Sequence, residues 1–330
     1  MNFRLIAPVL AAACTLVAAP ALHAQIVKLD GSSTVYPISE AVAEEFQKAK
    51  KQSIKVTVGI SGTGGGFKKF CRGETDISGA SRPILKKEMD DCKAAGIEYF
   101  ELPVAFDALT VVIHPKNTFI KQFTVAEMKK IWEPAAQGKV MKWNQVNPQW
   151  PDAPMKLFGP GADSGTFDYF TEAVVGKAKS SRGDFTASED DNVLVQGVAR
   201  DVNGLGYFGF AYYVENKDKL KAVPIVNEKG QPVLPSLEAV IAGTYSPLAR
   251  PIFIYVNVKA FGKGEVKEFV QYYMTHGAKL SKEVKYVPLP ESAYRTAWDH
   301  VLKGKKGTVF GGTAEVGITI EELLRREARI

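Results

Sequence analysis

The chain has 330 residues, of which 45% are hydrophobic and 24% charged, as in ordinary globular proteins. At this length two lobes are more common than one core. The formal net charge is +6, and the basic residues are scattered along the chain. Because a nucleic-acid-binding protein would be expected to gather them on one face, the sequence argues against a nucleic-acid partner, whereas a mild basic excess suits an anionic ligand.

The first 24 residues have the layout of a secretory signal peptide. Arg4 precedes an apolar stretch at 5–17, which is well short of the roughly 20 residues that span a bilayer. We expect cleavage after Ala24, and cleavage after Ala21 fits the Ala-x-Ala pattern equally well. Cys14 lies in the apolar stretch, but the residues before it lack the leucine of a lipobox. The sequence therefore predicts an exported, soluble protein without a lipid anchor.

Export leaves two cysteines in the mature chain, Cys71 and Cys92. An oxidising compartment favours one disulfide between them, which would close a loop of about 20 residues and contribute roughly 3 kcal/mol. Two buried thiols are the alternative. No histidine and cysteine cluster has metal-ligand spacing, so we expect neither a metal nor a cofactor.

Strand-like and helix-like segments alternate along the chain, which is typical of α/β architecture. The hydrophobic periodicity places helices at 38–50 and 66–71. In chain order, the expected strands of the first part are 26–29, 55–60 and 76–80.

Two strongly apolar, β-branched runs, 109–113 and 251–258, predict a pair of strands that cross between two lobes. The sequence after residue 266 is mostly helical in pattern. We therefore predict two α/β lobes joined by two strand crossings: lobe 1 comprises 25–113 together with 251–330, and lobe 2 comprises 114–250.

Three turns rich in small residues each lie between a strand and a helix, at 30–37, 59–66 and 159–166. The first turn of a helix carries four N–H groups without intrahelical partners, and the helix dipole adds about half a positive charge there. Glycine permits close approach of the backbone, and Ser and Thr add donors, so such turns bind phosphate-like anions. One such turn is commonly a plain helix cap, but three in one exported chain favour a shared anion.

Motifs of nucleotide-binding and hydrolytic enzymes fit poorly. The turn at 59–66 lacks the Gly-Lys-Ser/Thr ending of a P-loop. Asp163-Ser164-Gly165 does not satisfy the Gly-x-Ser-x-Gly spacing of a nucleophile elbow. A hydrolase would also need a base for the serine, and nothing in the sequence brings one of the three mature-chain histidines to it. The candidates would be His114, His276 and His300.

Two arginines are candidates for contacting an anion. Arg82 follows the strand-like segment 77–81, at the end of the strand where α/β folds place ligands. Arg182 lies in a polar loop. A guanidinium group holds two oxyanion oxygens at once, although a salt bridge within the protein is the alternative for either residue.

Taken together, these segments resemble the periplasmic phosphate-binding proteins of Pst-type ABC importers, a group of type II solute-binding proteins. The resemblance covers nearly the whole mature chain. The motifs that carry it are the three turns, the segments 77–83 and 131–132, and the segments 138–143 and 204–209. The segment 186–192 and the C-terminal part, 311–323, look most similar to a subgroup found in cyanobacteria and proteobacteria.

The resemblance implies that two lobes close on one phosphate without metal or cofactor. It assigns donors to the three turns. In chain order these are the hydroxyls of Ser33 and Thr34 and the Val35 N–H, then Ser61 or Thr63, then Ser164, the Gly165 N–H and Thr166.

The sequence departs from the better-studied branch of this family at two positions. That branch has an aspartate where this chain has Arg82, and an arginine shortly before Ser-Gly-Thr, where this chain has Pro160. Two other residues are candidates to supply the missing charges. Arg82 would be the cation, and Asp163 would be the carboxylate that accepts a hydrogen bond from the proton of phosphate. Asp163 as a simple helix cap is the alternative.

The sequence thus predicts a monomeric, non-enzymatic protein that binds inorganic phosphate in the periplasm and delivers it to the permease and ATPase subunits of an ABC importer. Two alternatives stay open: a binding protein for another tetrahedral oxyanion (sulfate, molybdate or arsenate), and an exported phosphatase-like enzyme.

Overall fold

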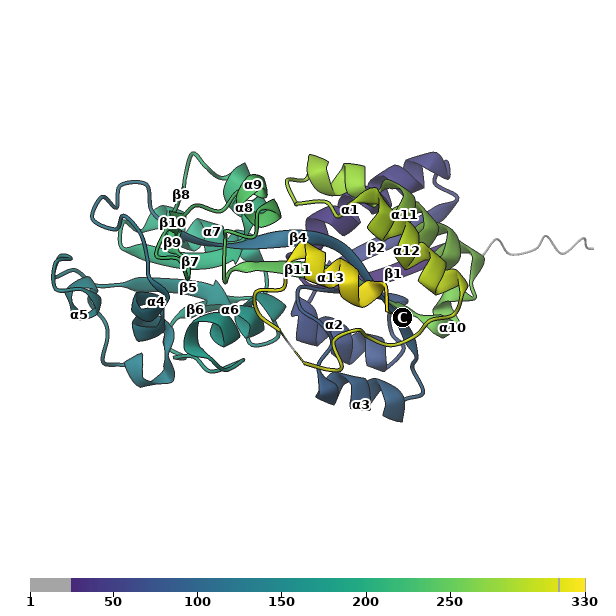
Figure 1. Cartoon of the computed structure of the whole chain (residues 1–330), viewed down its shortest axis with the longest axis horizontal. Helices are drawn as coiled ribbons and strands as arrows, with labels where there is room; N and C mark the ends of the chain where they lie inside the picture. Colours follow the sequence, from purple (N-terminus) through teal and green to yellow (C-terminus); the bar gives the residue numbers. More distant parts are fainter. Residues whose placement is uncertain (1–24, 314, 330) are drawn as a thin grey trace, which may run out of the picture.

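The computed structural model describes residues 25–313 and 315–329. The predicted signal peptide and Cys14 lie outside the described residues. Two α/β lobes lie side by side along the long axis of the molecule, and the strands β4 and β11 run from one into the other (Figure 1). We keep the names lobe 1 and lobe 2 for the division predicted from the sequence.

Lobe 1 is built on three parallel strands, each followed by a helix. β1 lies between β2 and β3, as expected for doubly wound connections. The strands are β1 (Gln25–Gly31), β2 (Ile54–Ile60) and β3 (Ile77–Ala80), and the helices are α1 (Tyr36–Ala49), α2 (Gly62–Cys71) and α3 (Lys86–Ala94). This arrangement brings the carboxyl ends of the strands, and the helix N-termini that follow, to the edge that faces lobe 2.

The crossing strands are β4 (Tyr99–Ile113) and β11 (Ala249–Asn257), which pair antiparallel. β4 pairs with β11 through Ala108 and with β7 from Leu109 onward, so one sheet path continues through both lobes. Every residue of β4 is buried, because helices and loops cover both faces of the sheet.

Lobe 2 contains three further parallel strands, with β5 between β6 and β7. The strands are β5 (Lys156–Pro160), β6 (Thr186–Ser188), β7 (Gly204–Gly209) and β8 (Lys221–Ala222), with the separate pair β9 (Ile225–Val226) and β10 (Pro232–Val233). The helices are α4 (Val125–Trp132), α5 (Trp143–Val146), α6 (Gly165–Val175), α7 (Asp191–Arg200), α8 (Phe210–Glu215) and α9 (Leu237–Ile241), with the 3₁₀ turn η1 (Pro134–Ala136).

The C-terminal helices return to lobe 1. They are α10 (Val258–Phe261), α11 (Gly264–Glu283), α12 (Glu291–Leu302) and α13 (Ile320–Glu327). α11 packs on α1 through buried aromatic rings, with Phe46 and Phe269 edge to face at 5.3 Å. In the described part of the chain, no helix combines the length and apolarity that a membrane crossing requires.

A disulfide joins Cys71 at the end of α2 to Cys92 in α3. The sequence left two buried thiols open as the alternative, and the structure has the disulfide. It ties together the two helices that precede and follow β3 in the chain, and α2 and α3 lie next to each other in Figure 1.

Candidate anion-binding site

The three turns predicted from the sequence meet between the lobes. The first loop (30–37) joins the second (59–66) through the Ser61 N–H, which donates to Gly31 O at 3.0 Å. The second joins the third (159–166) across the lobes, because the Gly64 N–H donates to Asp163 O at 2.7 Å.

The second loop is shorter than the sequence suggested, because α2 begins at Gly62 rather than at Gly66. Gly62 has a φ of +73°, and a Cβ there would lie 2.5 Å from Asp163 O. Only glycine fits this backbone conformation and this close approach. The glycine-rich sequence therefore serves the contact between lobes as well as the helix start.

Hydroxyl groups from all three loops gather at this junction. Thr34 Oγ1 and Thr166 Oγ1 lie 3.1 Å apart, and Thr63 Oγ1 lies 3.2 Å from Ser81 Oγ. A Cβ on Gly165 would come within 2.4 Å of Thr63 Oγ1 and 2.6 Å of Ser81 Oγ. The N-terminus of α6 thus abuts the second pair of hydroxyls, and its backbone N–H groups point outward from the helix start.

The cation of this cluster is Arg250 in β11. Its Nη2 donates to Thr166 Oγ1 at 2.7 Å and to Thr34 Oγ1 at 3.2 Å, and its Nη1 donates to Gly165 O at 3.3 Å. Asp107, in the neighbouring strand β4, accepts from the same guanidinium at 3.0 Å. One arginine therefore joins a crossing strand to the first and third loops.

Arg250 and Asp107 are both fully buried, at 0% and 1% exposure. Charge–charge and charge–dipole interactions are strong in such a dry environment, and a buried arginine must be paired. The second oxygen of Asp107 accepts from the Phe210 N–H at 3.1 Å. Asp107 thus fixes the orientation of the guanidinium and is itself held by the start of α8.

The remaining predicted donors of the first and third loops lie beside this cluster. The Val35 N–H donates to Ser32 O at 3.1 Å, and the Ser33 carbonyl accepts from the Tyr212 hydroxyl at 2.9 Å. Ser164 caps α6, since its hydroxyl accepts from the Thr166 N–H at 3.1 Å. Some of the polar groups of these residues therefore form hydrogen bonds that stabilise the loops themselves.

Of the two alternatives in the second loop, the structure brings Thr63 into the hydroxyl cluster. The Ser61 hydroxyl instead donates to the carboxylate of Asp30. That carboxylate also receives Lys69 Nζ at 2.8 Å. Ser61 therefore belongs to a separate polar group behind the second loop.

Arg82 lies near the junction, but its guanidinium makes four hydrogen bonds to groups of the protein. Nε donates to Asp168 at 2.6 Å, and Nη1 and Nη2 donate to Glu88 at 2.8 and 2.7 Å. Nη1 also donates to the Pro83 carbonyl. Asp168 belongs to α6 and Glu88 to α3, so Arg82 links the two lobes rather than facing an open position for an anion.

Arg182 lies elsewhere in lobe 2. It pairs with Asp184 and donates from Nη1 to the Ile131 and Val140 carbonyls at 3.1 and 2.8 Å. The structure therefore does not bring Arg182 to the junction of the three loops, since its hydrogen bonds to Asp184, Ile131 and Val140 lie within lobe 2. Its charge serves to satisfy buried carbonyl groups.

Asp163 also faces away from the hydroxyl cluster. Its side chain is 39% exposed and pairs with Lys68 at 2.7 Å across the lobes. Asp163 as the carboxylate of the anion site stays a prediction, and its exposure to solvent and its pairing with a lysine argue against that role.

A different carboxylate, Asp191 at the start of α7, is fully buried beside the first loop. Burial raises its pKa to about 7; Arg250 lowers the pKa, Asp107 raises it, and the Ser33 hydroxyl and Gly209 N–H lower it. The sequence analysis did not single out Asp191.

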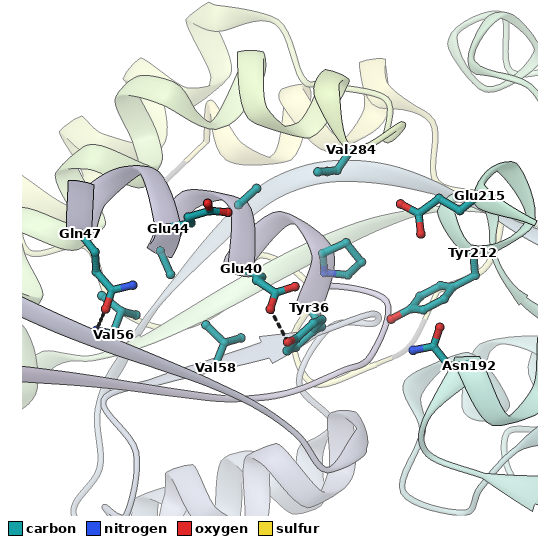
Figure 2. Close-up of a pocket in the computed structure, with 13 residues that line it drawn as sticks. Tyr36, Glu40, Glu44, Gln47, Val56, Val58, Asn192, Tyr212, Glu215 and Val284 are labelled. Atoms are coloured by element: carbon teal, nitrogen blue, oxygen red, sulfur yellow. Dashed lines mark hydrogen bonds between the residues drawn. The ribbon is translucent and has the colours of Figure 1, made fainter. Parts of the chain in front are cut away.

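The groove beside the first loop is acidic. It has a volume of about 600 Å³ and separates α1 from α7 and α8. Figure 2 shows Tyr36 and Glu40 on α1 facing Tyr212 and Glu215 on the other lobe, with the Tyr36 hydroxyl donating to Glu40 at 2.5 Å. Its carboxylates repel anions, so this groove is not the anion site.

Arg250 and Asp107 are the site residues that the sequence analysis missed. Both lie in the observed crossing strands β4 and β11, just before the predicted apolar runs 109–113 and 251–258. A single charged residue in such a buried strand is costly unless it is paired. The sequence signal that could have indicated this pair is an arginine beside one apolar run and an aspartate beside the other. Their pairing requires the antiparallel register of β4 and β11, in which Arg250 lies opposite Asp107.

A comparison with protein-family models matches residues 17–276 to the PBP superfamily domain. The chain belongs to the PBP superfamily. Among curated proteins, this PBP superfamily member is similar to the protein SphX of Synechococcus elongatus, with 56% identity over 92% of this chain and 89% of the relative. It is also similar to the phosphate-binding protein PstS of Staphylococcus saprophyticus, with 39% identity over 81% of this chain and 82% of the relative.

Among solved structures, the fold matches a protein of Clostridium perfringens, assigned as a phosphate ABC transporter substrate-binding protein and solved with bound phosphate. The TM-score is 0.66 and the identity 26%, over 81% of this chain and 100% of the other. The predicted α/β architecture of two lobes with strand crossings is therefore the PBP superfamily fold.

Proposed function

We propose that this chain binds inorganic phosphate between its two lobes and delivers it to an ABC importer without any catalytic step. The observation that carries the proposal is the junction at Arg250, where one buried guanidinium contacts hydroxyls from the first and third loops. The second loop adds the Thr63 hydroxyl beside Gly165.

Phosphate would stand among these groups and replace the direct contacts between hydroxyls with contacts to its own oxygens. Thr34, Thr63 and Thr166 supply hydroxyl donors, the N-terminus of α6 supplies N–H groups and a favourable dipole, and Arg250 supplies the positive charge. Because each loop fixes its own donors within its lobe, binding needs closure of the lobes but little reorganisation of the loops themselves. We expect a dissociation constant at or below the micromolar range, or roughly 8–10 kcal/mol.

The arrangement favours binding over hydrolysis. A serine nucleophile needs a base within hydrogen-bonding reach, and the histidines of the described chain bond elsewhere. His114 accepts from the Lys116 N–H, His276 lies 3.1 Å from Tyr272 O, and His300 faces Glu327. Ser164 has its hydroxyl at a helix cap instead.

The importer and the compartment follow from the relatives and from the N-terminal sequence. The proposal extends to this chain what the names of PstS and of the Clostridium protein say of those proteins. The layout of residues 1–24 supports export to the periplasm. A monomer suffices, since one chain supplies all three loops and the arginine.

The test is a calorimetric titration of purified residues 25–330 with phosphate, followed by competition with sulfate, molybdate and arsenate. We expect saturation at one phosphate per chain and weaker binding of sulfate. Tighter binding of another oxyanion would mean that this anion, rather than phosphate, is the ligand. Turnover of a phosphomonoester would show that the chain is an enzyme instead.

A further inference from the structure

Asp191 is a buried carboxylate that the proposed phosphate contacts leave unused. It is the first residue of α7, in lobe 2, and it is 0% exposed. Neither of its side-chain oxygens has a hydrogen-bond partner among the described residues. An ionised carboxylate in that condition costs several kcal/mol.

The groups that face Asp191 come mainly from lobe 1 and the crossing strands. The Ser33 hydroxyl of the first loop and the Gly209 N–H lie close to the carboxyl group, outside hydrogen-bonding geometry. Its charged neighbours are Arg250 in β11 and Asp107 in β4. The phenols of Tyr212 and Tyr286 also lie within its electrostatic reach, and the carboxylate of Asp190 acts on Tyr212 as well.

Closing of the lobes is what buries Asp191. The Tyr212 hydroxyl of lobe 2 donates to Ser33 O in lobe 1 at 2.9 Å, which holds the first loop over the start of α7. Opening the lobes would break this bond and separate Asp191 from Ser33. The carboxyl group therefore exchanges water for a dry environment each time the lobes close.

The charges around the proposed anion do not permit a second ionised carboxylate at low cost. Arg250 contributes one positive charge, and Asp107 already balances it at 3.0 Å. Phosphate adds one or two negative charges. An ionised Asp191 would add another negative charge without adding a cation, and the dipole of α7 offsets only a small part of that cost. Burial and repulsion between like charges both favour the neutral acid.

We propose that Asp191 takes up a proton when the lobes close on phosphate, so that phosphate binding is linked to proton uptake by the chain. The proton comes from solvent: an ionised Asp191, a proton and phosphate give a closed complex with the neutral acid. In this form Asp191 can donate a hydrogen bond at the edge of the site. The inference rests on the proposed phosphate-binding function.

The test is phosphate titration calorimetry at about pH 6, below the pKa of about 7 of the buried group and above the ordinary pKa of an exposed aspartate, in a series of buffers with different ionisation enthalpies. The slope of observed enthalpy against buffer enthalpy gives the number of protons taken up. Comparing wild type with Asp191→Asn removes the contribution of phosphate itself. We expect wild type to take up nearly one proton more than the variant.

Affinity gives a second readout. Between about pH 5 and pH 7 the affinity of wild type should fall with rising pH more steeply than that of Asp191→Asn, by up to about tenfold per pH unit. Asp190→Asn is the matched control. It removes a charge one residue away and keeps an N-cap for α7, and it should behave as wild type.

Each outcome decides a different point. Equal proton uptake in wild type and Asp191→Asn would overturn the inference while leaving phosphate binding intact. Loss of binding in a folded Asp191→Asn would also overturn it, since asparagine presents a neutral donor in the same place and the loss would mean that an ionised carboxylate is required. No binding by wild type would instead contradict the proposed function.

A measurement on the unmodified protein covers the case of a variant that does not fold. The ¹³C resonance of the Asp191 carboxyl in phosphate-saturated wild type should stay at the position of the protonated acid at pH 6, where an exposed aspartate is ionised. A resonance at the ionised position in that complex would overturn the inference.

Discussion

Two fully buried arginines lie between the lobes, and they differ in what surrounds them. Arg82 is bound by two carboxylates, Glu88 and Asp168, and by a backbone carbonyl. Arg250 is bound by one carboxylate, Asp107, and otherwise by hydroxyls and a carbonyl of the loops. The positive charge of Arg82 thus faces two negative charges. The positive charge of Arg250 faces one negative charge, and the hydroxyls around it can turn toward an anion.

The comparison shows that burial and position at a strand end do not identify an anion-binding arginine. The two arginines differ in the number of carboxylates that are paired with each guanidinium. An arginine paired with two carboxylates already uses most of its N–H donors, and the net charge of the group is negative. An anion placed beside it is therefore repelled. Replacing each arginine tests this difference directly.

Arg250→Ala should have the largest effect. We expect phosphate affinity to fall by roughly a thousandfold, because the substitution removes the cation and leaves Asp107 buried and unpaired. Calorimetry measures the loss, and circular dichroism checks that the variant is folded. Binding within tenfold of wild type would remove Arg250 from the proposed site.

Arg82→Met should act mainly on stability. Breaking a buried pair leaves Glu88 and Asp168 without a cation, and we expect the free energy of unfolding to fall by about 3 kcal/mol in a denaturant titration. Phosphate affinity should change less than tenfold. A folded variant that no longer binds phosphate would make the two arginines alike and refute the comparison.

A pH effect is expected far from the cleft, at the C-terminal helix. Burial and, to a smaller extent, the nearby Glu101 raise the pKa of Glu327 to about 8. A raised carboxyl pKa stabilises the fold at acid pH, and this contribution is lost as pH rises through 8. Glu327→Gln should therefore be more stable than wild type at pH 9, by roughly 2 kcal/mol.

The matched control for that measurement is Glu321→Gln, an exposed residue of the same helix. Its unfolding curve should follow that of wild type across the pH range. A Glu327→Gln variant with the same pH dependence as wild type would show that this carboxyl group is not buried as the structure describes.

Thr166→Val should reduce phosphate affinity by about tenfold. The two side chains have nearly the same shape, so the variant removes one hydroxyl that bonds to Arg250 at 2.7 Å. Hydrogen bonds to charged groups are worth about 1.5–3 kcal/mol. Thr57→Val, in β2 away from the junction, is the control, and equal affinities in both variants would argue against a hydroxyl contact.

Asp163→Asn should have the smallest effect. The pair with Lys68 is exposed to solvent and is worth at most about 1 kcal/mol. We expect phosphate affinity within threefold of wild type and unchanged rejection of sulfate, measured by competition calorimetry. Weaker sulfate rejection by tenfold or more would restore Asp163 as the carboxylate that distinguishes the two anions.

Much of the fold could be predicted because it depends on local patterns. The expected strands at 26–29 and 55–60 correspond to β1 and β2, and the apolar runs at 109–113 and 251–258 lie in the crossing strands. The three loops were also visible, since small residues between a strand and a helix form a local signal. Thr34, Thr63 and Thr166 come together as those loops suggested.

The charged part of the site could not be predicted in the same way. Whether an arginine is free for a ligand depends on partners distant in sequence: Arg82 meets Asp168, 86 residues away, and Arg250 meets Asp107, 143 residues away. Reasoning from the residues next to each loop therefore led to Arg82 and Asp163 as the charged residues of the site. The register of the two crossing strands, rather than any local motif, decides the outcome.

The most direct test of the account is a crystal structure of residues 25–330 with bound phosphate. We predict an anion that contacts the Arg250 guanidinium and the hydroxyls of Thr34, Thr63 and Thr166, with Arg82 still paired to Glu88 and Asp168. An anion bound to Arg82, or one held without Arg250, would contradict it.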